Sequence, residues 1–206
     1  ALTGRAFLYF AYPASWSGDM SWVAVDGYTA ATMLGISAQD GYASMPDAYT
    51  WSNAFFGLVP GSIGETSTIA ILLGLAILLV TKIASYRIVG GVILGTVVTS
   101  YFFNLVGSDT NPMFQMPFWW HMVMGGYAFG LVFMATEPVS GSHTNAGRWI
   151  YGFVIGFMVI MIRVLNPAYP EGMMLAILFG NLLSPLIDHF VVSRNISYRN
   201  KVLNAK

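Results

Sequence analysis

A short run near the start of the chain combines an acid with two hydroxyl groups among small side chains. Residues 26–32 read DGYTAAT, in which Asp26 precedes the hydroxyl groups of Thr29 and Thr32. A carboxylate in this place can cap a helix, because it accepts hydrogen bonds from the free N–H groups of the first turn. By themselves these residues predict a helix start with small packing side chains.

A second group of polar residues recurs inside the last apolar segment. Asn181, Ser184 and Asp188 are spaced three and four residues apart, which places them on one face of a helix. Pro185 has no N–H group and therefore frees the carbonyl of Asn181. Such hard oxygen ligands suit a small hard cation. A charge near the bilayer centre costs about 2.5–3.5 kcal/mol, so Asp188 is either functional or paired, for example with Arg194 near the cytoplasmic end.

Further polar residues stand at the ends of apolar segments. Glu137 opens a loop directly after such a segment, and Arg163 lies near the end of another, where Glu171 or Asp109 is its expected partner. Two histidines within apolar segments, at positions 121 and 189, are haem ligands in principle. They lie near opposite ends of their segments, and axial ligands of one haem need matched depth.

The elements that position these residues are predicted by an overall shortage of charge. The 206 residues include 9 Lys plus Arg and 9 Asp plus Glu, so 9% are charged and 56% are hydrophobic. A soluble domain carries about 25% charged residues. The composition therefore excludes an ordinary soluble globule and predicts a helical membrane protein. The zero net charge gives no basis for binding nucleic acid, and the absence of cysteine excludes disulfides and thiolate metal sites.

Five apolar segments are candidate membrane spans, and basic residues occur in every second loop between them. The positive-inside rule then places residues 81–87, 136–148 and the basic tail 193–206 in the cytoplasm. Residues 13–65, which carry acids and no Lys or Arg, fall on the outer side. We thus expect an outer segment with short hydrophobic or re-entrant elements (1–65) and a five-span bundle (66–192). The spans are residues 66–80, 88–106, 118–135, 149–165 and 172–192.

Glycine and proline punctuate these segments in two ways. Three spans contain two glycines four residues apart, at 91 and 95, 126 and 130, and 152 and 156, which allow close helix packing. Residues 53–68 are apolar at first and are then interrupted by Pro60, Gly61 and Gly64. Such a segment indicates either a transporter binding site or a surface loop that enters the headgroup region.

Several stretches resemble one family of membrane proteins. Residues 26–32 are similar to the flavinylation motif D-x-x-(S/T)-G-A-T, which occurs in the B subunit of the sodium-translocating NADH:quinone reductase and in the D subunit of the Rnf complex. The family's GRAFLFFAYP, PGSIGET and FMAT(D/E)PV elements resemble residues 4–13, 57–66 and 133–139, and residues 166–178 are closer to the reductase than to the Rnf protein. The resemblance covers essentially the whole chain and corresponds to the C-terminal half of the reductase protein. Because the chain starts with Ala1, we expect a piece of a longer polypeptide.

The resemblance implies a covalent cofactor and an ion pathway. Thr32 would carry FMN through a phosphoester made by an extracytoplasmic flavin transferase, with Asp26, Thr29 and Ala31 filling other motif positions. The chain departs from the motif at position 30, where alanine replaces glycine. Sodium would enter near Glu137 and Asp188, with Asn181 on the same path. Arg163 then has a second possible role, which is to stabilise the flavin phosphate or a reduced anionic flavin.

The implied fold is one repeat of a urea-transporter-like, inverted-repeat bundle in the bacterial inner membrane. The implied function is a membrane subunit that passes electrons toward quinone and couples this transfer to sodium translocation, while another subunit oxidises NADH. Riboflavin and ubiquinone would be shared with the rest of the complex, and membrane lipid surrounds the bundle. Two alternatives remain: a subunit of an Rnf-type ferredoxin:NAD electron-transport complex, and a redox-inactive channel or transporter repeat of urea-transporter type.

Overall fold

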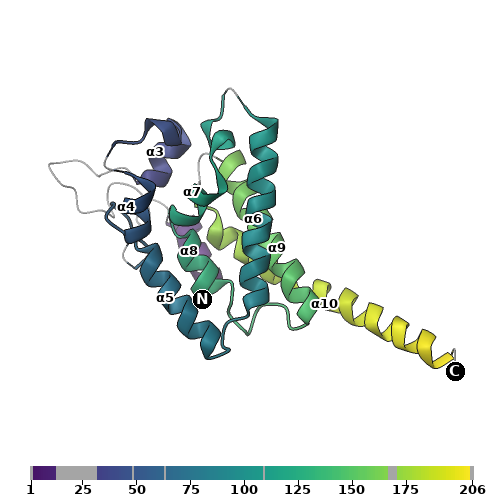
Figure 1. Ribbon diagram of the computed structural model, residues 1–206. Helices are drawn as coiled ribbons and strands as arrows, with labels where there is room; N and C mark the ends of the chain where they lie inside the picture. The colour runs from purple at the N-terminus through teal and green to yellow at the C-terminus, as the bar shows by residue number, and fades with distance from the viewer. Residues whose placement is uncertain are drawn as a thin grey trace.

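The computed structural model describes residues 2–12, 32–47, 49–62, 64–108, 110–166 and 171–204. Every regular element in these ranges is helical (Figure 1). Asp26, Thr29 and Ala31 of the flavinylation-like motif lie outside the described residues, and Thr32 lies within them. The helices are α1 (Leu2–Ala11), α3 (Met33–Gln39), α4 (Trp51–Phe56), α5 (Thr68–Val80), α6 (Tyr86–Val106), α7 (Phe118–Val123), α8 (Tyr127–Phe129), α9 (Asn145–Leu165) and α10 (Met173–Asn204).

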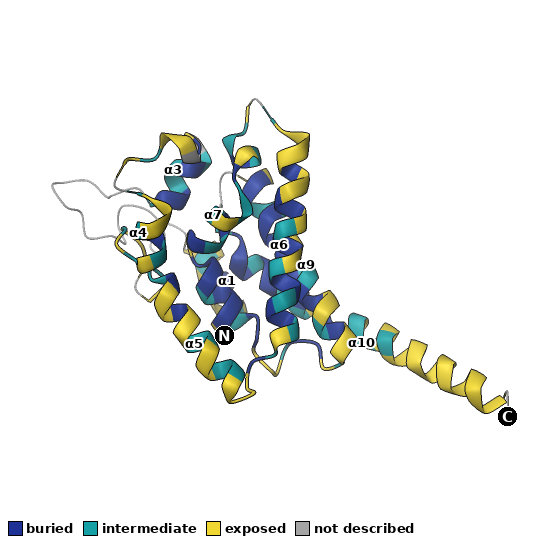
Figure 2. Cartoon of the chain, viewed as in Figure 1, coloured by how far each residue is buried: buried dark blue, intermediate teal, exposed yellow. Residues whose placement is uncertain are grey.

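Three of the described helices are long and apolar enough to cross a membrane. They are α6 and α9, with 21 residues each, and α10, with 32. Helix α5 has 13 residues, fewer than the roughly 17 that a span needs. Large apolar side chains are exposed, including Val80 at 82% and Leu182 at 76%. Figure 2 shows exposed residues along α5 and along most of α10. Such a surface suits lipid, and the expected helical membrane protein is confirmed.

Helices α6 and α9 pack closely along their glycines. A Cβ atom on Gly91 would lie 3.1 Å from the Cα of Gly152, and one on Gly95 would lie 3.2 Å from the carbonyl carbon of Gly156. Gly91 of α6 meets Gly152 of α9, and Gly95 meets Gly156 further along both helices. The two helices therefore run parallel. The close packing that the small-residue pattern predicts is present between these two helices, because only glycine lets the backbones approach so closely.

The third expected span, residues 118–135, is interrupted. Helix α7 ends at Val123, Met124 is extended with ψ 140°, and Gly125 has φ +61°. Helix α8 then begins at Tyr127 and continues as a π-helical turn over Gly130–Met134. Residues 118–135 are therefore not one continuous helix, because the chain turns at Gly125 in a conformation that favours glycine. The five-span bundle stays a prediction.

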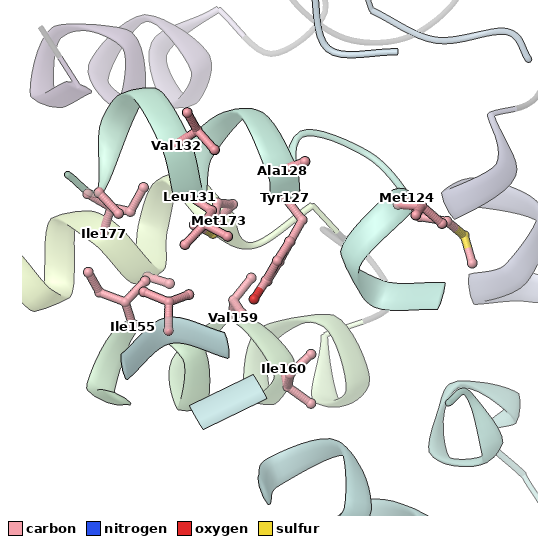
Figure 3. Close-up of a cluster of buried hydrophobic side chains, with 14 of the residues drawn as sticks. Met124, Tyr127, Ala128, Leu131, Val132, Ile155, Val159, Ile160, Met173 and Ile177 are labelled. Carbon is pink, nitrogen blue, oxygen red and sulfur yellow. The ribbon is translucent and has the colours of Figure 1, made fainter. Parts of the chain in front are cut away.

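The core lies where this broken segment meets α9 and the start of α10. Tyr127 projects from α8 toward Val159 of α9, among aliphatic side chains from three elements (Figure 3). Its hydroxyl group is fully buried and makes a 2.7 Å hydrogen bond with Thr96 of α6. This bond pairs the buried phenol, which would otherwise carry the cost of a lost hydrogen bond.

The connecting segments gather at two ends of the molecule. The α5–α6 turn and the segment before α9 lie at one end, and α3 lies at the other (Figure 1). This agrees with the alternation of basic loops in the sequence. The number of membrane crossings, the side that each end faces, and the urea-transporter-like repeat stay predictions.

Candidate functional site

A small cavity of about 90 Å³ lies beside Thr32. Its wall combines the start of α3, residues 59–62 with Glu65 and Thr66, the break between α7 and α8 at residues 123–126, and Glu171. The structure therefore brings the threonine of the flavinylation-like motif together with the Gly/Pro-interrupted segment. The sequence indicated a possible function for each of these two regions, but it did not indicate that they lie together.

Thr32 occupies the N-cap position of α3. Its backbone is extended, and its Oγ1 accepts a hydrogen bond from the N–H of Gly35 at 3.2 Å. Threonine is favoured at this position because it satisfies an N–H group that has no partner within the helix. Thr32 itself is half-buried and lines the cavity.

Two carboxylates converge on Gly126, which lines the same cavity. Glu171 Oε1 accepts a hydrogen bond from the Gly126 N–H at 2.8 Å. A Cβ atom on Gly126 would lie 2.7 Å from an oxygen of Glu65, so only glycine leaves room for both acids. Burial raises the pKa of Glu65, the charge of Glu171 raises it further, and the guanidinium of Arg5 lowers it in part.

Arg163 closes the break between α7 and α8 from inside the protein. Its side chain is fully buried. It donates to the carbonyl oxygens of His121 at 2.7 Å, Met124 at 2.9 Å and Glu171 at 3.3 Å. The carbonyls at the end of a helix have no partner within the helix, and a guanidinium suits them.

The two charges at this break follow the helix dipole. Arg163 lies at the carbonyl end of α7, and the Glu171 carboxylate lies at the N–H end of the next helical segment. The expected partner Glu171 is thus adjacent to Arg163, but Arg163 contacts its backbone carbonyl. This geometry favours the structural role of Arg163 over a direct contact with flavin phosphate, because the guanidinium is enclosed.

Asp188 anchors α10 to the start of α9. Its Oδ1 accepts from the hydroxyls of Ser142 and Thr144, both at 2.6 Å, and from the Thr144 N–H at 3.1 Å. Its Oδ2 accepts from the N–H of His143 at 2.8 Å. The sequence suggested Arg194 as the partner of Asp188. In the structure, these hydroxyl and N–H groups are its hydrogen-bond donors. Because Thr144 also caps α9, one carboxylate holds the loop, the helix start and α10 together.

The other two expected sodium ligands have separate partners. Asn181 accepts a 2.6 Å hydrogen bond from the hydroxyl of Tyr151, and exposed Glu137 accepts one from Ser140 at 3.1 Å. In the described part of the chain, no three acidic or histidine side chains gather closely enough to hold a metal ion. Asn181, Glu137 and Asp188 thus have different hydrogen-bond donors in the described structure.

Sequence reasoning missed the convergence of Glu65 and Glu171, and the hydroxyls that hold Asp188. Glu65 and Glu171 each stand next to a glycine at the edge of an apolar segment, which is the one local signal that could have marked them. Ser142 and Thr144 carry no comparable signal. Their role arises only when α10 folds back onto the loop.

Comparison with known proteins places this site in a family context. The model of the NQR2, RnfD, RnfE family matches residues 1–197. The B subunit of the Na(+)-translocating NADH-quinone reductase of Azotobacter vinelandii is 64% identical over 200 residues, which cover 97% of this chain and 50% of that protein. The protein of the same name from Chromohalobacter salexigens is 60% identical, over 98% of this chain and 49% of that protein. The chain thus spans about half the length of these relatives.

Proposed function

This chain belongs to the NQR2, RnfD, RnfE family, and from that premise we propose that it forms the C-terminal part of the membrane-embedded B subunit of a sodium-translocating NADH:quinone reductase. In this proposal Thr32 carries FMN covalently, and the protein passes electrons toward quinone while sodium crosses the membrane. Another subunit oxidises NADH. The names of the similar proteins favour the reductase over an Rnf-type complex.

The position of Thr32 is the observation that carries the flavin proposal. Its hydroxyl stands on the wall of a cavity and at the start of a helix, where an enzyme can reach it and a phosphoester can form. FMN would supply electron transfer there. The Gly35 N–H, which already donates to Oγ1, would face the new ester and would favour its negative charge.

The cavity fits the point of attachment better than it fits the whole cofactor. Its volume of about 90 Å³ is well below the roughly 300–1,000 Å³ of typical cofactor pockets. The flavin ring would therefore extend beyond it. Glu65 and Glu171 also line the cavity and disfavour a phosphate beside them, so Thr32 and the start of α3 are the residues that would hold it.

In-gel flavin fluorescence of the denatured full-length protein tests this proposal. The protein is produced in cells with an active flavin transferase. We expect a fluorescent wild-type band and a dark Thr32→Ala band. Thr32→Asn should be dark as well, although asparagine still caps α3 and so preserves the fold.

Thr50 offers a matched control for this experiment. It caps α4 through a hydrogen bond from the Asn53 N–H, as Thr32 caps α3. Thr50→Ala should lose a cap and keep the fluorescence. A dark wild-type band, or a fluorescent Thr32→Asn band, would remove the flavin from this site.

For sodium, we propose that Glu137 and Asp188 line the entry path at the end of the molecule opposite α3. The hydroxyls of Ser142 and Thr144 support this, because they add hard oxygen atoms to the Asp188 carboxylate. Asp188 would release some of these hydrogen bonds when sodium passes. Asn181 would contribute through its carbonyl oxygen once the Tyr151 hydroxyl turns away.

A further inference from the structure

A second cavity, of about 580 Å³, opens at the end of the molecule away from Thr32. The turn between α5 and α6 and the first residues of α6 form one wall. The segment from Thr136 to Arg148 forms the other. This volume is large enough for a small charged group. The flavin proposal does not use it, and the sodium proposal uses only Glu137 and Ser142 of its lining.

Three cations line this cavity against one carboxylate. They are Lys82, Arg87 and Arg148, and the acid is Glu137. Arg148 donates its Nε–H to the carbonyl of Ser142 at 3.2 Å. Among the described residues, its terminal N–H groups have no hydrogen-bond acceptor. The wall therefore carries a surplus of positive charge that favours an anion.

The start of α6 adds backbone donors to the same wall. Ser85 holds the N-cap position, yet its side chain makes no capping hydrogen bond. The Ser85 hydroxyl oxygen is buried and has no partner among the described residues. The first N–H groups of a helix attract anions, and this helix start lies in the wall that also carries the three cations.

We propose that this cavity binds the phosphate group of an anionic phospholipid. Lys82, Arg87 and Arg148 would neutralise the phosphate charge. The first turn of α6 would donate hydrogen bonds to its oxygens, as would Ser85 once its enclosed hydroxyl turns toward the cavity. Apolar side chains beside the cavity favour a lipid over a free anion. Ile83 and Val80 are 58% and 82% exposed, and they continue the lipid-facing surface of α5.

The test of this proposal is the binding of short-chain lipids to the full-length protein. The protein is purified in its complex, in neutral detergent, and is stripped of lipid. Dioctanoyl phosphatidylglycerol is titrated and detected by calorimetry and by the rise in unfolding temperature. Dioctanoylglycerol, which lacks the phosphate, is the ligand control. We expect the phosphatidylglycerol to bind and the diacylglycerol to bind far more weakly.

Variants separate the charge from the fold. Removing one basic residue near a membrane surface costs about 1 kcal/mol, or roughly fivefold in affinity. Arg148→Gln and Lys82→Asn should each show this loss, and together roughly 25-fold. Asparagine suits position 82 because Lys82 has φ 58°, which asparagine tolerates better than most residues. Arg148→Lys should retain most of the affinity.

Two further variants complete the test. Ser85→Ala should weaken phosphatidylglycerol binding without lowering the unfolding temperature of the lipid-free protein, since its hydroxyl has no partner to lose. Arg194→Gln, a control on the exposed part of α10, should bind like wild type. Wild-type affinity in Arg148→Gln and Lys82→Asn, or an equal loss in Arg194→Gln, would overturn the proposal.

Inorganic phosphate distinguishes the two sources of this chemistry. If the occupant is a lipid, millimolar phosphate should leave phosphatidylglycerol binding unchanged. Competition by phosphate that the same variants abolish would keep the phosphate site and replace the lipid with a free anion. Failure of both ligands to bind would overturn the site itself.

Discussion

Two interruptions of the helical chain handle charge in opposite ways. At the break between α7 and α8, Arg163 is fully buried and donates to three carbonyl groups, while Glu171 accepts from a backbone N–H. At the turn between α5 and α6, Lys82 and Arg148 line an open cavity beside a hydroxyl that has no partner in the described chain. The first interruption uses its charges to close the fold. The second leaves its charges available.

The comparison shows that residue type alone does not distinguish a structural charge from a binding one. An arginine inside an apolar helix invites a functional interpretation, because such a charge is expensive in a membrane. Here the three carbonyl groups that accept from Arg163 account for that cost. Basic residues near a helix end are commonly explained by the positive-inside rule alone. Here Lys82, Arg87 and Arg148 line one cavity, and this arrangement favours a bound ligand.

Arg163→Met should have the largest effect on stability. It would leave three carbonyl groups without their donor, at about 1–3 kcal/mol each when buried, so we expect a loss of at least about 3 kcal/mol. Arg163→Lys should recover only part of this, because one ammonium group cannot match the planar fork of arginine. The unfolding temperature of the full-length protein in its complex measures both.

Arg148→Gln provides the contrast for that measurement. It removes a cation that donates one described hydrogen bond, to the Ser142 carbonyl, and lines an open cavity. We expect its effect on the lipid-free protein to stay below about 1.5 kcal/mol, the upper range for one hydrogen bond. The contrast between the two interruptions would fail if Arg148→Gln destabilised the protein as much as Arg163→Met.

Asp188→Asn should have an intermediate effect. Its amide would present N–H groups to donors that now bind a carboxylate, and we expect a loss of about 1–3 kcal/mol. Glu137→Gln, on an exposed side chain, should change stability by less than about 0.5 kcal/mol. If both acids lie on the sodium path, both variants should raise the sodium concentration needed for half-maximal turnover.

Sodium dependence thus separates anchoring from transport at this end of the molecule. A normal sodium requirement in Asp188→Asn, together with lost stability, would make Asp188 an anchor alone. A normal requirement in both variants would remove these acids from the sodium path. Turnover of the assembled complex, titrated with sodium at constant ionic strength, gives the answer.

Glu65→Gln should have the smallest effect, and its sign depends on pH. The pKa of Glu65 is raised by burial and by Glu171, so its ionised form is disfavoured in the folded protein. Stability contributed by this carboxyl is therefore lost as the pH rises from its ordinary pKa of 4.5 through the raised value. At pH 8 the glutamine variant should unfold at a slightly higher temperature than wild type.

At pH 4 the two proteins should unfold at nearly the same temperature, because wild-type Glu65 is then protonated. Glu171→Gln is the matched variant. It removes the like charge but weakens acceptance from the Gly126 N–H, so it should not stabilise the protein at pH 8. If Glu65→Gln lowered the unfolding temperature at pH 8, the ionised Glu65 carboxylate would stabilise the folded protein. It would then act as Arg163 and Glu171 do at the α7–α8 break.

Much of the helical framework could be predicted from the sequence. The shortage of charge predicts a membrane protein, and the glycine spacing predicts close helix packing, which α6 and α9 show. The local pattern of residues 118–135 is misleading, because an apolar run has the same composition whether or not the helix breaks at Gly125. The accessible hydroxyl of Thr32 was identified by resemblance to a motif, and its cavity depends on residues up to 139 positions away in the chain.

The sequence by itself determined which segments are apolar, which glycines permit close packing, and which loops carry the basic residues, since these properties depend on side-chain chemistry and local spacing. Tertiary structure alone decided the role of each charge. Arg163 became a helix cap because three carbonyls from α7 and the loop before α10 surround it, and Asp188 became an anchor because a distant loop donates to it. Hydrogen-bond partners far apart in the chain meet only when the helices pack.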